Sequence, residues 1–288
     1  MTAPYLGNPK RTIEVLQKYE FVFQKKFGQN FLIDTHVLDK IINAADITKD
    51  DFVLEIGPGI GTMTQYLACA AREVYAVEID KALIPILEDT LSDYSNVTVL
   101  NEDILKVDIR KLAEEHNQGK PIKVVANLPY YITTPIIMKI LEEGVKASSI
   151  TIMMQKEVAD RIKAGPGTKA YGALSVAVQY YCTVDKVASV PRSVFVPQPN
   201  VDSVVLRLNI RSEKAVKLDN EKLFFDCVKA GFGQRRKTLL NSLQKVNGVD
   251  KNIVMQSLAS AGIDESRRAE TLTIEEFALI ANEVNKRL

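Results

Sequence analysis

Hydrophobic and polar positions divide most of the chain into short apolar runs and longer stretches with helical spacing. The apolar runs, rich in β-branched residues, cover positions 52–56, 74–79, 97–100, 122–126, 150–154, 176–184 and 204–210. Near-continuous apolar strands joined by crossover-length segments are typical of parallel sheets that are covered on both faces. The pattern therefore predicts an α/β fold with a mostly parallel, doubly wound sheet. The last two runs are joined by a Pro-rich loop and predict an antiparallel edge.

The strand pattern ends after residue 210. Residues 220–288 have the spacing of amphipathic helices, interrupted at Gly248 and Gly262, and the segment 211–219 is polar without a strong period. We therefore predict two domains, an α/β domain over residues 1–212 and a small all-α domain over residues 213–288.

Composition excludes several classes of protein. An apolar fraction of 46% in 288 residues suffices for packed cores, and the longest apolar runs are far shorter than the roughly 18 residues that span a bilayer. Residues 1–20 carry charges throughout and lack the apolar stretch of a secretory signal, so we expect no membrane association and a cytoplasmic location. Three widely spaced cysteines and two histidines predict neither a disulfide framework nor a metal site.

Charge is distributed unevenly although the net charge is only +1. Residues 1–30 carry +3, residues 31–185 carry −7 and residues 186–288 carry +5. Basic ends around an acidic middle suggest that the ends contact a polyanion and that the middle binds something else, such as a cationic ligand. Solvated helix faces without a partner are the alternative explanation.

A glycine-rich loop follows the first predicted strand. Gly57, Gly59 and Gly61 lie in the sequence Glu-Ile-Gly-Pro-Gly-Ile-Gly-Thr, at the sheet edge where doubly wound folds bind nucleotides. A dinucleotide fingerprint would require a glycine at position 62, where Thr62 stands, so a nicotinamide cofactor is disfavoured.

Two acidic residues follow the next two strands. Glu78 comes 21 positions after Gly57, where a carboxylate can accept both hydroxyls of a ribose. Asp103, after the third strand, can accept a hydrogen bond from an adenine amino group. Their placement at successive strand ends predicts one shared adenosine-containing ligand.

The fourth strand run leads into Asn127-Leu128-Pro129-Tyr130. The lone pair of an adenine amine is delocalised into the ring, so an enzyme that alkylates this nitrogen must localise the pair. The Asn127 side-chain oxygen and the Leu128 carbonyl, fixed by Pro129, can each accept one amine N–H and direct the lone pair at an electrophile. Tyr130 would stack on the base. An ordinary turn is the alternative explanation.

Together these residues resemble class I S-adenosylmethionine-dependent methyltransferases that act on adenine amines. More specifically, the chain resembles the small-subunit (16S) rRNA adenine N6-dimethyltransferases of the KsgA/RsmA family. The matching blocks are residues 26–32, 55–61, 127–135, 155–158, 171–175, 195–203 and 232–243.

The resemblance implies S-adenosylmethionine as cofactor, S-adenosylhomocysteine as product, and no metal. It places Asn30 and Leu32 at the cofactor entrance, Gly57 at the methionine portion, Glu78 at the ribose, Asp103 at the adenine, and Asn127 at the reaction centre. Gly59 and Gly61 complete the cofactor loop. Phe195 would stack on the target base opposite Tyr130.

The resemblance also implies an RNA partner, 16S rRNA within the small (30S) ribosomal subunit, with no obligate protein partner evident and a role in ribosome biogenesis. Arg235, Arg236 and Lys237 would contact phosphates, and Lys25 and Lys26 would form a second contact near the cofactor. The α/β domain would then be catalytic and the helical domain would recognise rRNA. The alternatives are a large-subunit rRNA methyltransferase of the antibiotic-resistance type, a non-catalytic assembly factor and a nicotinamide-dependent oxidoreductase.

Overall fold

The computed structural model describes residues 3–24, 27–128 and 132–288, which form two compact units. One unit comprises Met1–Ala159 and Val184–Ile210, and the other comprises Asp160–Thr183 and Arg211–Leu288. Residues 160–183 thus group with the C-terminal helices, whereas we predicted them in the first domain. The assignment of catalysis and rRNA recognition to two domains stays a prediction.

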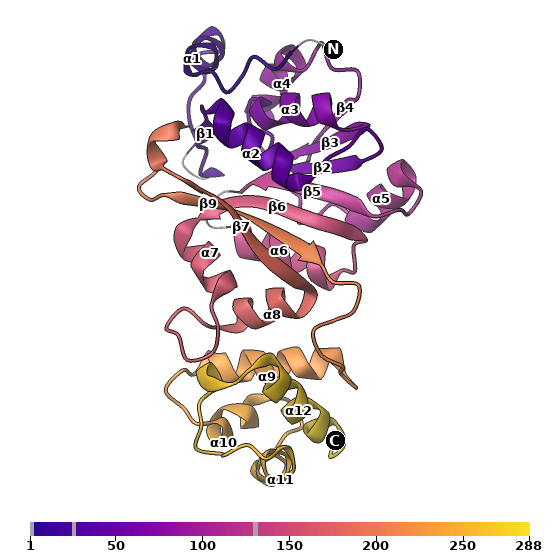
Figure 1. Ribbon diagram of the computed structural model, residues 1–288, viewed down its shortest axis with the longest axis vertical. Helices are drawn as coiled ribbons and strands as arrows, with labels where there is room; N and C mark the ends of the chain where they lie inside the picture. The colour runs from indigo at the N-terminus through magenta and orange to yellow at the C-terminus, as the bar shows by residue number, and fades with distance from the viewer. Residues whose placement is uncertain (1–2, 25–26, 129–131) are drawn as a thin grey trace. The chain divides into compact units, whose positions relative to one another are not determined.

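The first unit is built on a sheet of seven strands in the order β4-β3-β2-β5-β6-β9-β7 (Figure 1). The strands are β2 (Phe52–Ile56), β3 (Glu73–Glu78), β4 (Val97–Asn101), β5 (Ile122–Asn127), β6 (Ala147–Gln155), β7 (Cys182–Val190) and β9 (Ser203–Ile210). The five strands β4, β3, β2, β5 and β6 run parallel to one another, and β9 pairs antiparallel with β6. The predicted fold class is confirmed.

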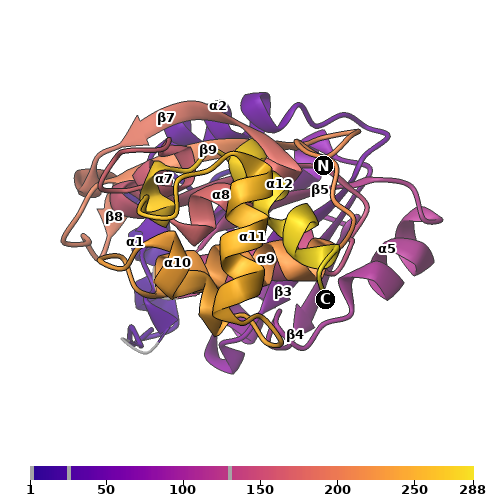
Figure 2. The ribbon, with the colours of Figure 1, turned by 90° about the horizontal axis from the view of Figure 1, so that it is seen from below.

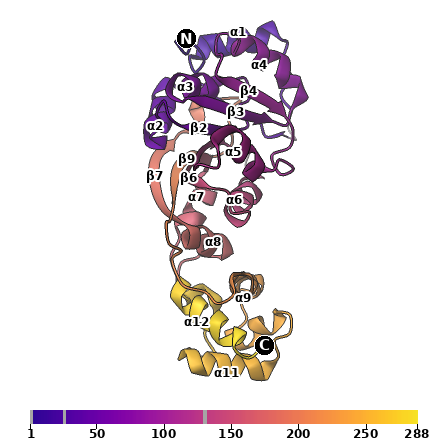
Figure 3. The same ribbon diagram turned by 90° about the vertical axis from the view of Figure 1, so that its right-hand side faces the viewer.

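Two crossovers fix the site of ligand binding. The connection from β2 to β3 passes through α3 (Thr62–Ala70), and that from β5 to β6 passes through α6 (Thr133–Glu142). They run in opposite directions along the strand order, so right-handed crossovers place these helices on opposite faces. Figure 3 shows α3 with α2 (Thr35–Ala45) on one side and α6 with α5 (Ile109–Asn117) on the other. The direction reverses between β2 and β5, where such sheets bind ligands.

One hydrophobic core of this unit lies between the sheet and the helices on the α3 side. Val53, Val74 and Val125 of the strands pack with Leu67 of α3 and with α4 (Ile84–Thr90). The N-terminal segment adds α1 (Pro9–Lys18) and β1 (Phe31–Leu32), which pairs antiparallel with β8 (Phe195–Val196) after the short helix η3 (Arg192–Val194).

The predicted strand over residues 176–184 is wrong in its first part. This stretch forms most of α8 (Ala173–Tyr181), which follows α7 (Lys156–Lys163), and β7 begins only at Cys182. Valine and tyrosine favour strands, but nearly every side of this helix is buried, so packing overrides the propensity. Ser175 supports the helix start, where its hydroxyl accepts the Gly172 N–H at 3.1 Å.

The predicted helices after residue 220 are confirmed. They are α9 (Glu221–Gly233), α10 (Leu239–Ser242), α11 (Lys251–Ala261) and α12 (Ile274–Asn285), with the short helices η4 (Leu243–Lys245) and η5 (Ala269–Thr271). Helix α12 packs on α9 and α11, as Figure 2 shows from below. Gly262 ends α11 in the left-handed conformation that glycine favours. No described helix combines the length and the apolar content that crossing a membrane requires.

Candidate active site

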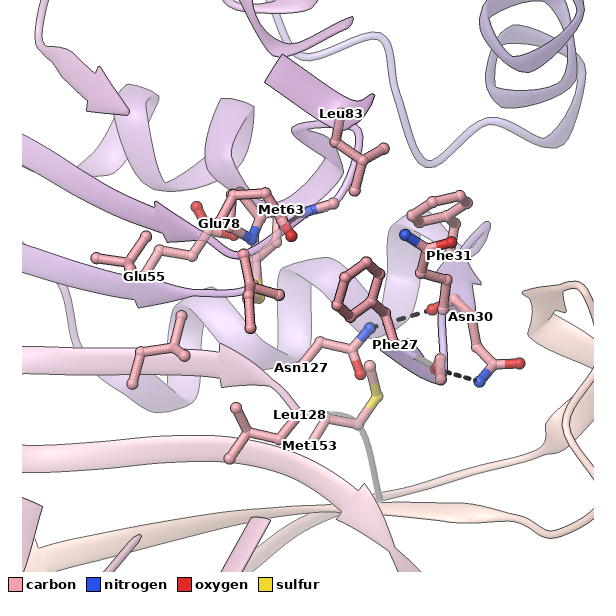
Figure 4. A pocket seen from close by; sticks show the side chains of 18 of the residues that line it. Phe27, Asn30, Phe31, Glu55, Met63, Glu78, Leu83, Asn127, Leu128 and Met153 are labelled. Carbon is pink, nitrogen blue, oxygen red and sulfur yellow. Dashed lines mark hydrogen bonds between the residues drawn. The ribbon is translucent and has the colours of Figure 1, made fainter. Parts of the chain in front are cut away.

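A cavity of about 300 Å³ opens at the carboxyl ends of the strands on either side of the crossover reversal (Figure 4). It is lined by residues 27–32, 55–59, 62–63, 77–79, 102–104 and 127–128, together with Leu38, Leu83, Ile132, Ile136, Met153 and Phe195. The predicted residues Asn30, Leu32, Gly57, Gly59, Glu78, Asp103, Asn127, Leu128 and Phe195 therefore meet in one cavity.

The glycine loop brings its backbone to this cavity. At Gly59 an added Cβ would lie 2.9 Å from the Phe31 ring, and φ is +63°, so only glycine fits. At Gly57, with φ +72°, the nearest atom to an added Cβ is the Asn127 carbonyl oxygen at 3.8 Å, which leaves room for a ligand against the backbone. Gly61 lies outside the cavity lining, at the start of α3, where an added Cβ would meet Thr90.

Glu78 ends β3 with a carboxylate already held by backbone. Its Oε1 accepts the Asp80 N–H at 2.8 Å and its Oε2 accepts the Gly59 N–H at 3.1 Å. Burial raises the pKa of Glu78 to about 7, and these two backbone hydrogen bonds act in the opposite direction. Each carboxylate oxygen keeps acceptor capacity, so the group can also accept two hydroxyls.

Asp103 follows the end of β4 and lines the same cavity, half-buried. Its Oδ1 accepts the Leu105 N–H at 2.9 Å, which fixes the side chain within its own loop. Parallel strands bring this carboxylate and that of Glu78 to the same sheet edge, as predicted.

Asn127, the last residue of β5, has a defined amide orientation. Its Nδ2 donates to the Asn30 carbonyl at 3.3 Å, and the Asn30 side chain donates in turn to the Gly28 carbonyl at 2.9 Å (Figure 4). The first bond uses the donor side of the Asn127 amide, so Oδ1 is the end left for an incoming N–H. Leu128 is buried and its N–H donates to the Met153 carbonyl at 3.1 Å.

The aromatic pair is only half described. Phe195 lies opposite Leu32 in the β1–β8 pair, lines the cavity and is 3% exposed. It also belongs to the hydrophobic core, so its stacking on a target base stays a prediction. Pro129 and Tyr130 lie outside the described residues.

Glu55 is a site residue that sequence reasoning missed. It lies in β2 with no exposed surface, lines the cavity, and neither carboxylate oxygen has a hydrogen-bond partner among the described residues. Burial raises the pKa of Glu55 to about 8, the Thr64 hydroxyl acts in the opposite direction, and the Glu78 charge adds a smaller increase. The sequence feature that could have identified it is an acidic residue inside an otherwise apolar strand.

The predicted RNA-binding residues of the second unit lie between α9 and α10 and are exposed. Arg235 donates to the carbonyls of Lys169 and Tyr171 at 2.6 and 3.0 Å, so part of its role is structural. Lys25 and Lys26 lie outside the described residues. Within the described ranges no three His, Cys, Asp or Glu side chains cluster in a way that could hold a metal ion.

The fold and the cavity define a class I methyltransferase. Residues 20–286 match the family model described as "Ribosomal RNA adenine dimethylase", and the chain belongs to this family.

Similar proteins agree with this assignment. The chain is 60% identical over 287 residues to "Ribosomal RNA small subunit methyltransferase A" of Lachnoclostridium phytofermentans, covering 99% of each chain. It is 55% identical to the protein of the same name from Clostridioides difficile, covering 98% of each.

Two solved structures are also similar. A dimethyladenosine transferase from Plasmodium falciparum gives a TM-score of 0.75 at 29% identity, covering 89% of this chain and 98% of that one. The 23S rRNA methyltransferase ErmE gives 0.67 at 27% identity, covering 88% and 99%. The predicted family, enzyme class and S-adenosylmethionine cofactor are confirmed, and the nicotinamide alternative is not favoured.

Proposed function

We propose that this enzyme transfers methyl groups from S-adenosylmethionine to the N6 amines of two adjacent adenosines in the 3′-terminal hairpin of 16S rRNA, two groups per base. The substrate would be the small (30S) ribosomal subunit in the cytoplasm, as a step of ribosome biogenesis. The names of the similar proteins support the small subunit. The observation that carries the chemistry is the Asn127 amide, whose oxygen is left for an incoming N–H beside the predicted cofactor residues.

The cavity fits the cofactor in three respects. The open space against Gly57 suits the methionine portion, the Glu78 carboxylate suits the ribose hydroxyls, and Asp103 suits the adenine amine. Asn30 and Leu32 line the entrance from the other side. When bound, S-adenosylmethionine supplies an electrophilic methyl group on a cationic sulfur.

Glu55 supplies a negative charge suited to this cofactor. A buried carboxylate with no hydrogen-bond partner among the described residues favours its neutral form, and a cation beside it lowers the pKa and restores the charge. S-adenosylmethionine carries an ammonium group and a sulfonium, so we assign Glu55 to its charged methionine portion.

Asn127 and Leu128 would orient the amine of the target base. Asn127 Oδ1 accepts one amine N–H and the Leu128 carbonyl accepts the other, which directs the nitrogen lone pair toward the methyl group. Tyr130 and Phe195 would hold the extruded base between their rings. No general base is required, because the proton is lost after the nitrogen has become cationic.

The second unit would bind rRNA phosphates. Arg236 and Lys237 are exposed. Arg235 could contact a phosphate only through the guanidinium N–H groups that do not donate to its two carbonyl partners. Lys25 and Lys26 would add a second contact. Residues 213–288 would therefore recognise rRNA, and residues 1–212 would bind the cofactor and catalyse transfer.

Transfer of labelled methyl groups tests the proposal. Small subunits lacking the modification are compared with large-subunit rRNA, and the product nucleosides are identified. We expect dimethyladenosine in the small subunit alone. Label in large-subunit rRNA would indicate the resistance-type activity instead, and RNA binding without any transfer would indicate a non-catalytic assembly factor.

A further inference from the structure

Asp80 lies just after Glu78 and is 3% exposed, yet it does not line the cavity. Its carboxylate accepts three hydrogen bonds. Oδ1 accepts the Ala82 N–H at 3.1 Å at the start of η2 (Lys81–Leu83), and it accepts Gln24 Nε2 at 3.3 Å. Oδ2 accepts Gln29 Nε2 at 2.6 Å. Asp80 therefore joins the end of β3 to a segment 51 to 56 residues earlier in the chain.

The Gln29 amide is held at both ends. Its Oε1 accepts the Gln24 N–H at 2.8 Å, while its Nε2 donates to Asp80. The amide cannot rotate without losing both bonds, because rotation would present Oε1 to a carboxylate and Nε2 to an N–H. Only an acceptor at position 80 satisfies this arrangement.

The segment that this bond holds forms one wall of the cavity. Six consecutive residues, 27–32, line it, and the Asn30 carbonyl accepts the Asn127 amide. On the other side, the Asp80 N–H donates to Glu78 Oε1. One buried side chain thus connects the wall that orients Asn127 with the strand end that carries the predicted ribose acceptor.

We propose that Asp80 is a positioning residue for methyl transfer: through Gln29 and Gln24 it holds residues 27–32 against the end of β3, and so orients Asn127 without touching cofactor or base. This inference rests on the proposed roles of Asn127 and Glu78. It goes beyond them because it assigns the orientation of the Asn127 side chain to a polar contact outside the cavity.

The variant Asp80→Ser separates this role from simple helix capping. Serine keeps an oxygen that can accept the Ala82 N–H, but it is too short to hold both glutamines. Gln29→Ala removes the contact from the other side and leaves the cap intact, but it also alters a side chain that lines the cavity and accepts the Gln24 N–H, so Asp80→Ser is the decisive variant for product binding. Asp51→Asn is the matched control, because Asp51 precedes β2 and accepts Lys123 Nζ at 2.9 Å and the Thr48 N–H at 2.7 Å, outside the cavity lining.

We expect Asp80→Ser and Gln29→Ala each to weaken S-adenosylhomocysteine binding about tenfold in calorimetric titration, since each loses a hydrogen bond to a charged group. At saturating S-adenosylmethionine, kcat should also fall about tenfold, because Asn127 is less well oriented. The losses in the double variant should be less than additive, because both single variants remove the bond between Asp80 and Gln29, although each also loses one bond to Gln24. Hydrogen exchange of amides 27–33 should accelerate in both variants and not in Asp51→Asn.

Two results would overturn the proposal. Unchanged product affinity and exchange in Asp80→Ser would reduce Asp80 to a helix cap, and fully additive losses in the double variant would mean that the two residues act separately. If the unaltered enzyme fails to bind S-adenosylhomocysteine, the cofactor assignment fails instead. The exchange of amides 27–33 still tests the Asp80 contact in that case, because it requires no ligand.

Discussion

Replacement of Glu55 by glutamine should stabilise the folded protein in a pH-dependent way. The pKa of Glu55 is raised from an ordinary value of 4.5 to about 8 by burial. Between these two values the folded state binds a proton that the unfolded state has released, so the free energy of unfolding falls as pH rises. Glutamine resembles the protonated carboxyl and does not titrate, so the variant lacks this loss.

The magnitude follows from the pH window. Each pH unit between the two pKa values corresponds to about 1.36 kcal/mol, so the advantage of Glu55→Gln over the parent should grow by about 3 kcal/mol between pH 5 and pH 7. The advantage should level off about one pH unit above the folded-state pKa of about 8. A buried amide without partners costs about 1–3 kcal/mol, but this offset does not vary with pH. The slope of the difference is therefore the prediction.

Urea unfolding followed by circular dichroism at pH 5, 6, 7 and 8 measures this slope. Asp51→Asn is the control whose difference from the parent should stay constant across pH 5–8, because hydrogen bonds from Lys123 and Thr48 outweigh burial and lower the Asp51 pKa below this range. The stability that Asp51 contributes is present above its ordinary pKa and is lost at acidic pH. Parallel stability curves for Glu55→Gln and the parent across pH 5–8 would refute the reasoning. Weaker binding of S-adenosylhomocysteine by the same variant would agree with a functional reason for keeping the acid.

Four other variants test separate parts of the protein. Gly59→Ala should reduce S-adenosylhomocysteine binding at least tenfold in calorimetric titration, because its Cβ would lie 2.9 Å from an aromatic ring at φ +63°; unchanged affinity would show that the loop adjusts freely. Asn127→Ala should slow single-turnover methyl transfer about 10²-fold while RNA binding, measured by filter retention, persists; near-parental turnover would remove Asn127 from the mechanism. Replacing Arg236 and Lys237 by alanine should flatten the salt dependence of RNA binding by a slope of about 2; an unchanged slope would assign both to a solvated surface. Arg235→Ala should instead lower the thermal midpoint, because its guanidinium holds two backbone carbonyls; an unaltered midpoint would contradict that structural role.

The central strands of the sheet could be predicted because they are buried on both faces. The run 52–56 coincides with β2, in which all five residues are buried, so composition alone indicates it. The stretch 176–184 misled for the same reason: a helix buried on most sides has the composition of a strand, and its neighbours are distant in sequence.

The candidate site could be predicted only in part. Residues at strand ends, such as Glu78 and Asp103, were found because parallel topology brings successive strand ends to one edge. Glu55 was visible as an acid in an apolar run, but its lack of partners depends on the whole surroundings. The contact of Asp80 with Gln29 spans 51 residues and follows no local periodicity, so sequence alone could not reveal it.

A crystal structure with S-adenosylhomocysteine bound tests the central claim most directly. We predict the product in the cavity at the ends of β2, β3 and β5, with both ribose hydroxyls within about 3 Å of the Glu78 carboxylate and the adenine amine beside Asp103. The sulfur should face Asn127 Oδ1, which marks the position of the target amine. A product bound elsewhere, or in this cavity with its sulfur turned away from Asn127, would contradict the account.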